Sequence, residues 1–259
     1  MSDIVETPFG RFATDPRDRS VSQALRRHGE YGRSELEALE IFLQAARHVL
    51  VLGAHIGAMT VPIARRVERV TAIEANPRTF ALLQRNIALN GLENVVLLNR
   101  AVGAGRGQIE FIDYVNFSGG SKVLPKHNLE SYLDKDAQVI SVECDTVDAL
   151  FPDQSFDLVL MDIEGSEHAA LQGMPNTLAK AATLGIEFIP HHLQNVSDID
   201  VEEFLRPLSA FGTMYSPRLS RVERGDKIRE LLQQMFEHDI SDECLIFHKG
   251  PVMVGKKAL

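Results

Sequence analysis

Two glycines and one acid stand where the chain could hold a nucleoside cofactor. Gly53 ends the apolar run 48–53, Gly57 follows it, and Glu74 ends the next apolar run, 69–74. A glycine lets the backbone approach a ligand without a Cβ in the way. An acid about 20 residues after the first glycine is placed to accept hydrogen bonds from ribose hydroxyls. The pattern favours a nucleoside site over a turn built for packing alone or a carboxylate that is merely exposed.

The loop between these glycines is less open than a dinucleotide site requires. The dinucleotide fingerprint G-x-G-x-x-G presents a helix N-terminus to a pyrophosphate, but His55 takes the place of its central glycine. A cofactor with ribose and adenine but no phosphate fits better. S-adenosylmethionine is such a cofactor, and its amino-acid end can lie across Gly53 and His55. An NAD-dependent oxidoreductase and a non-catalytic cofactor-binding protein remain as alternatives.

Two carboxylates follow the later apolar run 157–162. Asp162 and Glu164 are two residues apart, and such residues share a face of an extended strand. Together they could bind a substrate, act as a base, or hold a divalent ion with Glu187. Alternatively, Asp162 caps the next helix and Glu164 fixes the turn.

Two histidines follow the apolar run 183–188. Histidine titrates near neutral pH and is the commonest general base, so His191 or His192 could deprotonate an acceptor. Either could also be a plain surface residue. The pair resembles half of a metal site, but no third ligand is close in sequence. A divalent metal is therefore considered but not favoured.

The elements that must position these residues alternate between strand and helix. Continuous apolar runs are typical of strands buried on both faces, and their alternation with helices implies a parallel sheet with right-handed crossovers. The expected strands are 48–53, 69–74, 95–98, 157–162 and 183–188, and the expected helices are 58–67, 78–90 and 167–180.

Other segments are expected to surround this core. Residues 1–35 form an N-terminal extension or lid, helical around 21–27, and 36–259 form a single domain. A helix begins at Ser34 as N-cap. Between residues 104 and 145 we expect edge strands at 108–112 and 138–143 and a flexible loop at 116–121. Toward the C-terminus we expect a helix at 199–210, a strand at 211–216, a helix at 225–237 and a strand at 244–248.

Composition limits the class of protein. The 259 residues carry a net charge of −9, and an acidic surface disfavours nucleic acid as a partner. Only Cys144 and Cys244 occur, without metal spacing, which suits a reducing cytoplasm. No signal peptide or run of about 20 apolar residues is visible. We expect a cytoplasmic protein without a membrane span, compatible with a homodimer.

Several segments resemble the FkbM family of S-adenosylmethionine-dependent methyltransferases. Residues 51–57 with Thr60 look like the family's first motif, and 72–77 is similar to its Glu-Pro-x-Pro stretch. Residues 86–90 with 95–101 resemble its third strand. The segment 156–167 resembles the Asp-x-Glu-Gly-x-Glu signature, and a Leu-x-Gly ending follows it at 171–173. The chain departs from the family's pattern at Val51, His55 and Leu160.

The resemblance implies a Rossmann-like class I methyltransferase fold: a mostly parallel seven-stranded sheet with an antiparallel C-terminal edge strand and helices on both faces. It implies O-methylation of a hydroxyl on a sugar, glycolipid or secondary metabolite, so the partner is a small-molecule or glycan acceptor. From its own residues, the loop 114–133 either contacts the acceptor or is a plain surface loop. The expected catalytic residues are Asp162, Glu164, His191 and His192, and the expected cofactor residues are Tyr31, Glu35, Gly53, Ala54, His55, Gly57, Thr60, Glu74, Ala75, Asn76, Ala101 and Asp162.

Overall fold

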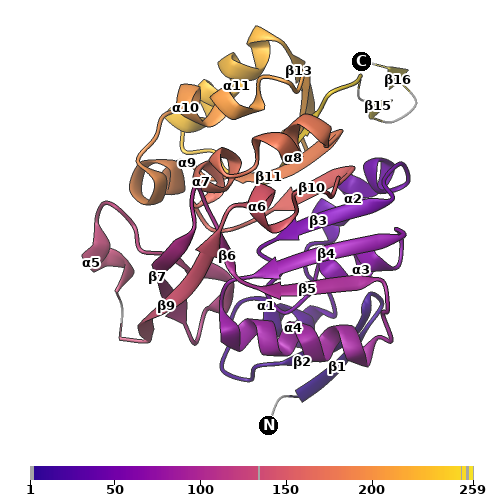
Figure 1. Cartoon of the computed structure of the whole chain (residues 1–259), viewed down its shortest axis with the longest axis vertical. Coiled ribbons are helices and arrows are strands. Elements are labelled where there is room, and N and C mark those ends of the chain that lie inside the picture. The colour runs from indigo at the N-terminus through magenta and orange to yellow at the C-terminus, as the bar shows by residue number, and fades with distance from the viewer. Residues whose placement is uncertain (1–2, 134, 252, 255–256, 259) are drawn as a thin grey trace.

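Parallel strands with apolar sequences lie at the centre of the molecule. The computed structural model describes residues 3–133, 135–251, 253–254 and 257–258. All side chains of the strand Leu158–Met161 are buried. Strands covered on both faces keep water from both rows of side chains, which explains the continuous apolar runs. In spatial order the strands are β11 (Thr183–Phe188), β10 (Leu158–Met161), β3 (His48–Leu52), β4 (Arg69–Glu74) and β5 (Val95–Asn99) (Figure 1).

Three C-terminal strands complete this main sheet by antiparallel pairing. β14 (Asp242–His248) pairs with β11, β12 (Thr213–Ser216) with β14, and β13 (Arg221–Arg224) with β12. The order β13-β12-β14-β11-β10-β3-β4-β5 confirms the predicted α/β fold with a mostly parallel sheet. The sheet has eight strands instead of seven, because the polar segment that forms β13 gave no apolar signal. The antiparallel β14 also lies inside the sheet, and β13 forms the edge.

Helices cover both faces of the main sheet, as predicted. Successive strand residues point to opposite faces, so Val49 and Val51 pack in one apolar cluster and Leu50 and Leu52 in another. The first cluster includes residues of α1 (Val21–His28), α2 (Arg33–Leu43), α3 (Thr60–Ala64) and α4 (Pro77–Leu89). The second includes residues of α6 (Val147–Leu150), α7 (Glu167–Gln172), α8 (Pro175–Lys180), α10 (Val201–Leu205) and α11 (Asp226–Glu237).

Some helix predictions differ from the structure in their boundaries, and two of the differences have a clear local cause. The predicted helix 167–180 is divided between α7 and α8, because Pro175 has no N–H to continue a helix and occupies the first turn of α8. The predicted N-cap Ser34 is wrong: α2 begins at Arg33, and Gly32, which adopts a φ of 67°, is its N-cap. That left-handed conformation favours glycine over serine.

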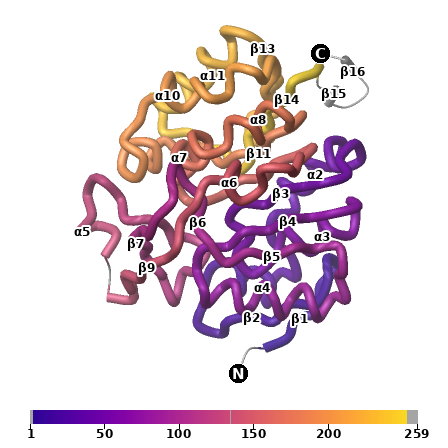
Figure 2. Tube along the Cα trace, viewed as in Figure 1, coloured from indigo at the N-terminus to yellow at the C-terminus, as the bar shows by residue number. Residues whose placement is uncertain are grey.

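A second sheet holds the segments that were expected as edge strands. β7 (Gly107–Tyr114) and β9 (Ala137–Asp145) pair antiparallel with each other, and β6 (Ala101–Val102) and β8 (Lys122–Val123) flank them. We call this four-stranded unit the side sheet. Because β6 follows directly on β5, the side sheet lies beyond the carboxyl ends of the parallel strands (Figure 2).

The N-terminal segment packs against the domain. The hairpin β1 (Asp3–Thr7) and β2 (Gly10–Thr14) precedes α1, and Phe12 and Ala13 are fully buried. The Asn86 side chain of α4 accepts a hydrogen bond from Ala13 N at 2.6 Å and donates to Ala13 O at 3.2 Å. The predicted helix at 21–27 is confirmed by α1, and the two strands were not predicted.

The remaining elements are short. Within the described part of the chain, no helix is long and apolar enough to cross a membrane. The predicted C-terminal helix 199–210 is shorter and continues as a 3-10 turn. The remaining short elements are the 3-10 turns Ser118–Gly120 and Arg206–Leu208, the π-helical turn Leu193–Ser197, α5 (Leu129–Tyr132), α9 (Pro190–His192), β15 (Met253–Val254) and β16 (Lys257–Ala258).

Candidate active site

One cavity opens at the carboxyl ends of the parallel strands. The empty space in it, counted with its open mouth, is about 1200 Å³. Its walls come from the ends of β3, β4 and β10, from the side sheet, from the start of α2 and from the start of β14. The carboxyl ends of parallel strands are where open α/β sheets bind ligands.

The turn after β3 lies against the end of β10. Gly53 has a φ of 82°, and a Cβ at this position would lie 1.7 Å from the carbonyl oxygen of Asp162. Gly53 N and Ala54 N both donate to the carbonyl oxygen of Ile73. The turn is therefore held between β4 and β10, and only glycine fits at its start.

Glu74 is fixed at the cavity wall by three hydrogen bonds. Its Oε2 accepts from His55 N at 2.7 Å, and its Oε1 accepts from Asn76 N at 2.8 Å and Thr79 Oγ1 at 2.9 Å. Burial raises the pKa of this carboxyl, and the hydrogen bonds oppose that shift. A carboxylate has about four acceptor positions, so Glu74 retains one for a ligand hydroxyl.

His55 links the turn to the side sheet. It adopts a φ of 49°, and its Nε2 lies 2.8 Å from Ser118 Oγ. Burial lowers its pKa to about 4, so the imidazole is neutral at pH 7. Its backbone N–H is already bonded to Glu74, and its Nδ1 is buried without a hydrogen-bond partner among the described residues. Any contact from His55 to a cofactor would therefore come from the ring.

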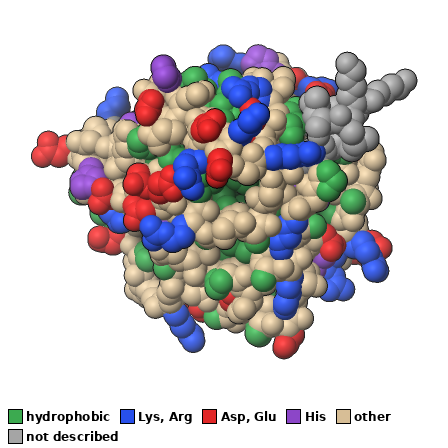
Figure 3. Space-filling view, turned by 90° about the horizontal axis from the view of Figure 1, so that it is seen from above, with side chains coloured by type: hydrophobic (Ala, Val, Ile, Leu, Met, Phe, Trp, Pro, Cys, Tyr) green, Lys and Arg blue, Asp and Glu red, His purple; other side chains and the backbone are tan. Residues whose placement is uncertain are grey.

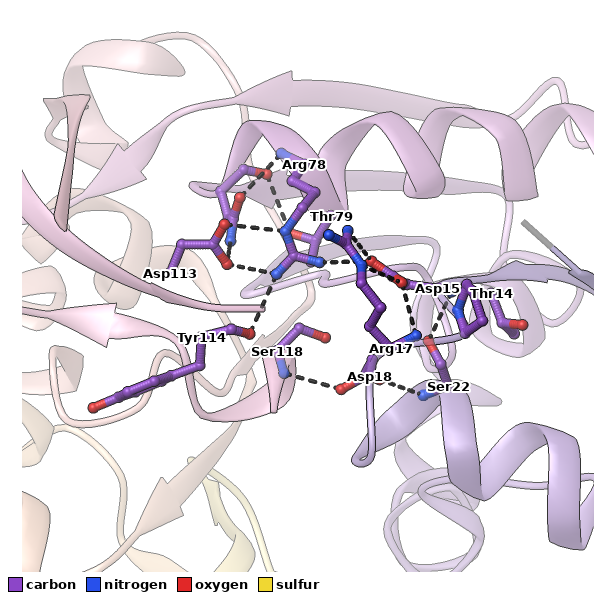
Figure 4. A network of polar contacts seen from close by, with 12 residues as sticks. Thr14, Asp15, Arg17, Asp18, Ser22, Arg78, Thr79, Asp113, Tyr114 and Ser118 are labelled. Carbon is purple, nitrogen blue, oxygen red and sulfur yellow. Dashed lines mark hydrogen bonds and ion pairs between the residues drawn. The ribbon is translucent and has the colours of Figure 1, made fainter. Parts of the chain in front are cut away.

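A buried polar network fixes the N-terminal segment to this wall (Figure 4). The carboxylate of Asp18 accepts hydrogen bonds from Ser118 N at 2.9 Å and Ser22 N at 2.7 Å. Arg78 of α4 bridges Asp113 of β7, at 3.0 Å from its Nε, and Asp15, at 3.1 Å from its Nη1. The network thus joins three parts of the chain beside the cavity.

Asp18→Asn is expected to destabilise the protein by about 1.5–3 kcal/mol at pH 7, because a charged acceptor of several hydrogen bonds is lost. Burial raises the pKa of Asp18, but hydrogen bonds from Ser20, Ser22 and Ser118 bring it below the usual 3.8. A lowered pKa in the folded state means that this stabilisation is present above about pH 4 and is lost as the pH falls through the folded-state pKa. Urea unfolding at pH 7 and pH 3 measures both values. Asp3→Asn, which alters an exposed side chain, is the control, and equal losses at the two pH values would contradict the assignment.

Four carboxyl groups line the part of the cavity beside Gly53. Asp162 and Glu164 follow β10, Glu35 lies in the first turn of α2, and Glu243 lies in β14. We call these four residues the acid wall. The cavity walls desolvate Asp162 although it is exposed to the cavity; this desolvation, and then the charges of Glu164 and neighbouring acids, raise its pKa well above the usual range. Negative charge concentrated in a cavity favours a cationic ligand such as a sulfonium.

Glu164 is held by a buried cluster behind the cavity wall. Its φ is 56°, and its Oε2 accepts a hydrogen bond from Lys122 Nζ at 3.0 Å. Lys122 Nζ also lies 2.8 Å from His192 Nε2, and His192 Nδ1 lies 3.4 Å from Glu187 Oε2. Burial, and then the charge of Lys122, lowers the pKa of His192 to about 3. Its imidazole is therefore neutral at pH 7, with Nε2 accepting from Lys122.

The predicted residues divide into those on the cavity wall and those behind it. Gly57, Thr60 and Asn76 support the turns without lining the cavity. His191 is exposed and contacts Tyr132, and His192 lies in the cluster behind Glu164, so the structure does not bring the histidine pair to the wall. The predicted residues that do line the cavity are Tyr31, Glu35, Gly53, Ala54, His55, Glu74, Ala75, Ala101, Asp162 and Glu164.

Several lining residues were not predicted. Ser166 lies in the signature turn, and its buried Oγ has no hydrogen-bond partner among the described residues. Glu243 and Cys244 enter the wall because β14 lies beside β11, a pairing that one strand's sequence does not reveal. Ser118 belongs to the segment expected as a flexible loop.

The chain belongs to the FkbM family of methyltransferases: the family model for the methyltransferase FkbM domain matches residues 52–235. It is thus a methyltransferase, and its methyl donor is S-adenosylmethionine. The matched region contains the Gly53 turn, Glu74 and the signature segment 156–167. No curated protein matches the chain.

Solved structures show only distant likeness. The protein PH0793 of Pyrococcus horikoshii is 16% identical, with 82% of this chain and 62% of that one covered and a TM-score of 0.44. M. jannaschii TYW2 in complex with AdoMet is 14% identical, with 95% and 84% covered and a TM-score of 0.45. T. thermophilus 16S rRNA N2 G1207 methyltransferase is 14% identical, with 96% and 50% covered and a TM-score of 0.42. At these scores the family assignment rests on the sequence match alone.

Proposed function

We propose that this methyltransferase transfers the methyl group to a hydroxyl of a sugar, glycolipid or secondary metabolite. The proposal depends on two acidic residues, one on each side of the turn after β3. Glu74 accepts a hydrogen bond from the amide of His55, the backbone carbonyl of Asp162 lies against Gly53, and both residues line the cavity. In this arrangement the ribose hydroxyls contact Glu74 and the sulfonium faces Asp162.

The residues suit transfer to an oxygen. The acceptor oxygen attacks the methyl carbon in line, the carbon–sulfur bond breaks, and neutral S-adenosylhomocysteine leaves. The hydroxyl proton must go to a base, and Asp162 and Glu164 are the lining carboxylates that follow β10. Alignment of the two reactants supplies much of the acceleration, and proton transfer contributes typically 10²–10⁴-fold.

The segment 1–35 serves as the lid in this proposal. Tyr31, Gly32 and Glu35 line the cavity next to the Gly53 turn. The polar network through Asp18 and Arg78 attaches the preceding residues to the side sheet. The lid would therefore shield the reacting atoms from water while the N-terminal hairpin stays in place.

The acceptor is proposed as a small molecule or glycan, in keeping with the charge of the surface. The basic side chains at 218–229 do not form a continuous basic patch: Arg221 pairs with Glu223, and Arg229 Nε lies 2.8 Å from Glu202 Oε1. In Figure 3 acidic and basic side chains are interspersed over the visible face. Such a surface favours no polyanion.

Calorimetric titration with S-adenosylhomocysteine and with NAD tests the cofactor site. We expect S-adenosylhomocysteine to bind and NAD to bind much more weakly, because the His55 turn leaves no open helix N-terminus for a pyrophosphate. Tighter NAD binding would support the oxidoreductase alternative. Absence of turnover with a panel of sugars, glycolipids and hydroxylated metabolites, despite cofactor binding, would support a non-catalytic cofactor-binding protein.

Glu74→Gln is expected to weaken S-adenosylhomocysteine binding about tenfold and to lower the free energy of unfolding by about 1–3 kcal/mol. The amide has one acceptor oxygen, so its NH₂ group must face the N–H of His55 or the donors of Asn76 and Thr79. Calorimetry and urea unfolding measure the two effects. Glu93→Gln, at an exposed position, is the control. Unchanged affinity in Glu74→Gln would remove the ribose role.

A further inference from the structure

A buried group of side chains begins at Glu164 of the acid wall and has the composition of a cation site. Glu164, Glu187 and His192 each offer one ligand atom, and these atoms all lie within 4.8 Å of one another. Glu187 and His192 are more than nine-tenths buried. His192 Nδ1 has no hydrogen-bond partner among the described residues and lies 3.4 Å from Glu187 Oε2. Such a set of one imidazole and two carboxylates is suited to a divalent transition metal.

A lysine ammonium already occupies the space between these ligands. Lys122 Nζ lies 3.0 Å from Glu164 Oε2 and 2.8 Å from His192 Nε2, and those two ligand atoms are 3.6 Å apart. A metal would sit about 2.0–2.2 Å from each ligand atom. A metal bound to Glu164 Oε2 and His192 Nε2 would need the lone pairs that now face the ammonium, so Lys122 and a metal exclude each other.

The surroundings of Lys122 also hold the ammonium in place. Its side chain is 7% exposed, and the ring of Tyr132 lies 5.8 Å from Nζ. Two of its three N–H donors are directed to Glu164 and His192, and the aromatic face provides further attraction for a cation. A buried ammonium requires such partners, because an unpaired one would be strongly destabilising.

We infer that Lys122 is the resident cation of this cluster and takes the place that a divalent metal would otherwise fill. The inference rests on the proposed function only for its consequence in catalysis. By its bond to Glu164, Lys122 fixes the position of that carboxylate at the cavity wall. Lys122 also joins β8 of the side sheet to the signature turn, and it is a positioning residue for Glu164.

The test is metal binding by purified protein without an affinity tag, followed by the visible absorption of Co²⁺ and by calorimetry with Zn²⁺. The wild type should bind neither ion at this cluster. Lys122→Ala removes the ammonium and leaves the three ligands, and it should bind one equivalent at least about 100-fold more tightly than any residual binding by the wild type, the scale on which a metal site's immediate surroundings act. Adding His192→Ala should abolish the new site. Lys122→Arg keeps the charge and should bind no ion.

The controls separate this inference from the proposed function. Lys126 lies in the segment that follows β8, and its Nζ donates to Ser197 O. Lys126→Met should behave as the wild type. Lys122→Gln gives a second test if Lys122→Ala folds poorly, and circular dichroism with and without Co²⁺ monitors folding of both. One equivalent bound by the wild type and lost in His192→Ala would overturn the inference, as would no binding by either Lys122→Ala or Lys122→Gln. S-adenosylhomocysteine titration reports separately on the cofactor site.

Discussion

Gly53→Ala should weaken S-adenosylhomocysteine binding and lower the rate of methyl transfer by about 100-fold or more, the scale expected for the rate when reacting groups move by about 1 Å. The new Cβ would lie 1.7 Å from the carbonyl oxygen of Asp162, which is backbone and cannot rotate away. An alanine at a φ of 82° adds about 1–2 kcal/mol of strain. The turn must therefore move away from β10, and Ala54 and His55 move with it. Calorimetric titration of the variant measures the loss.

Gly91→Ala is the matched control for this variant. Gly91 also has a positive φ, 61°, but an added Cβ meets no atom within 4 Å. It should lose about 1–2 kcal/mol of folding stability from strain and keep the wild-type affinity. If Gly53→Ala folds and binds S-adenosylhomocysteine as the wild type does, the turn does not contact the cofactor.

The sequence predicted the parallel core because both faces of its strands are buried. Where burial makes the residues of a strand apolar, as in Leu158–Met161, the strand is visible without any knowledge of its neighbours. The same holds for Gly53 and Glu74, whose roles depend on local geometry at a strand end. Such residues can be placed from their position in one strand–turn–helix unit.

The incorrect details concern strand pairings and contacts that the hydrophobic pattern does not reveal. The polar strand β13 is defined by pairing with β12, and the side sheet by the pairing of β7 with β9. Neither pairing leaves an apolar run. The segment 116–121 looked flexible because of its glycines and serines, yet Ser118 is buried by bonds to Asp18 and His55.

The histidine pair shows the same limit within the site. Its place after β11 was read from the sequence, but the direction of each side chain depends on partners elsewhere. His192 is turned toward Lys122 and Glu187, whereas His191 lies near the ring of Tyr132. Lys122 is 70 residues from His192 in sequence, and no spacing rule relates two residues so far apart.

Asp162→Asn should lower the rate of methyl transfer by about 10²–10⁴-fold, the usual contribution of a general base. Asparagine has nearly the same shape but cannot accept the acceptor's proton. The main chain of Asp162 stays bonded through its N–H to Leu52 O, so the Gly53 turn and the affinity for S-adenosylhomocysteine should change little. Formation of S-adenosylhomocysteine, measured with an acceptor that the wild type methylates, gives the rate.

The pH profile distinguishes a base from a residue that only binds. Desolvation by the cavity walls, and then the charge of Glu164, raise the pKa of Asp162 well above its usual 3.8. Only the ionised form can take a proton, so the wild-type rate should rise with pH through this raised pKa, and the rise should be absent in Asp162→Asn. Asp153→Asn, at an exposed position, should retain both rate and profile. Full turnover by Asp162→Asn would show that Asp162 is not the base. An unchanged acidic limb at reduced turnover would assign that limb to another carboxyl group, with Glu164 of the acid wall as the candidate.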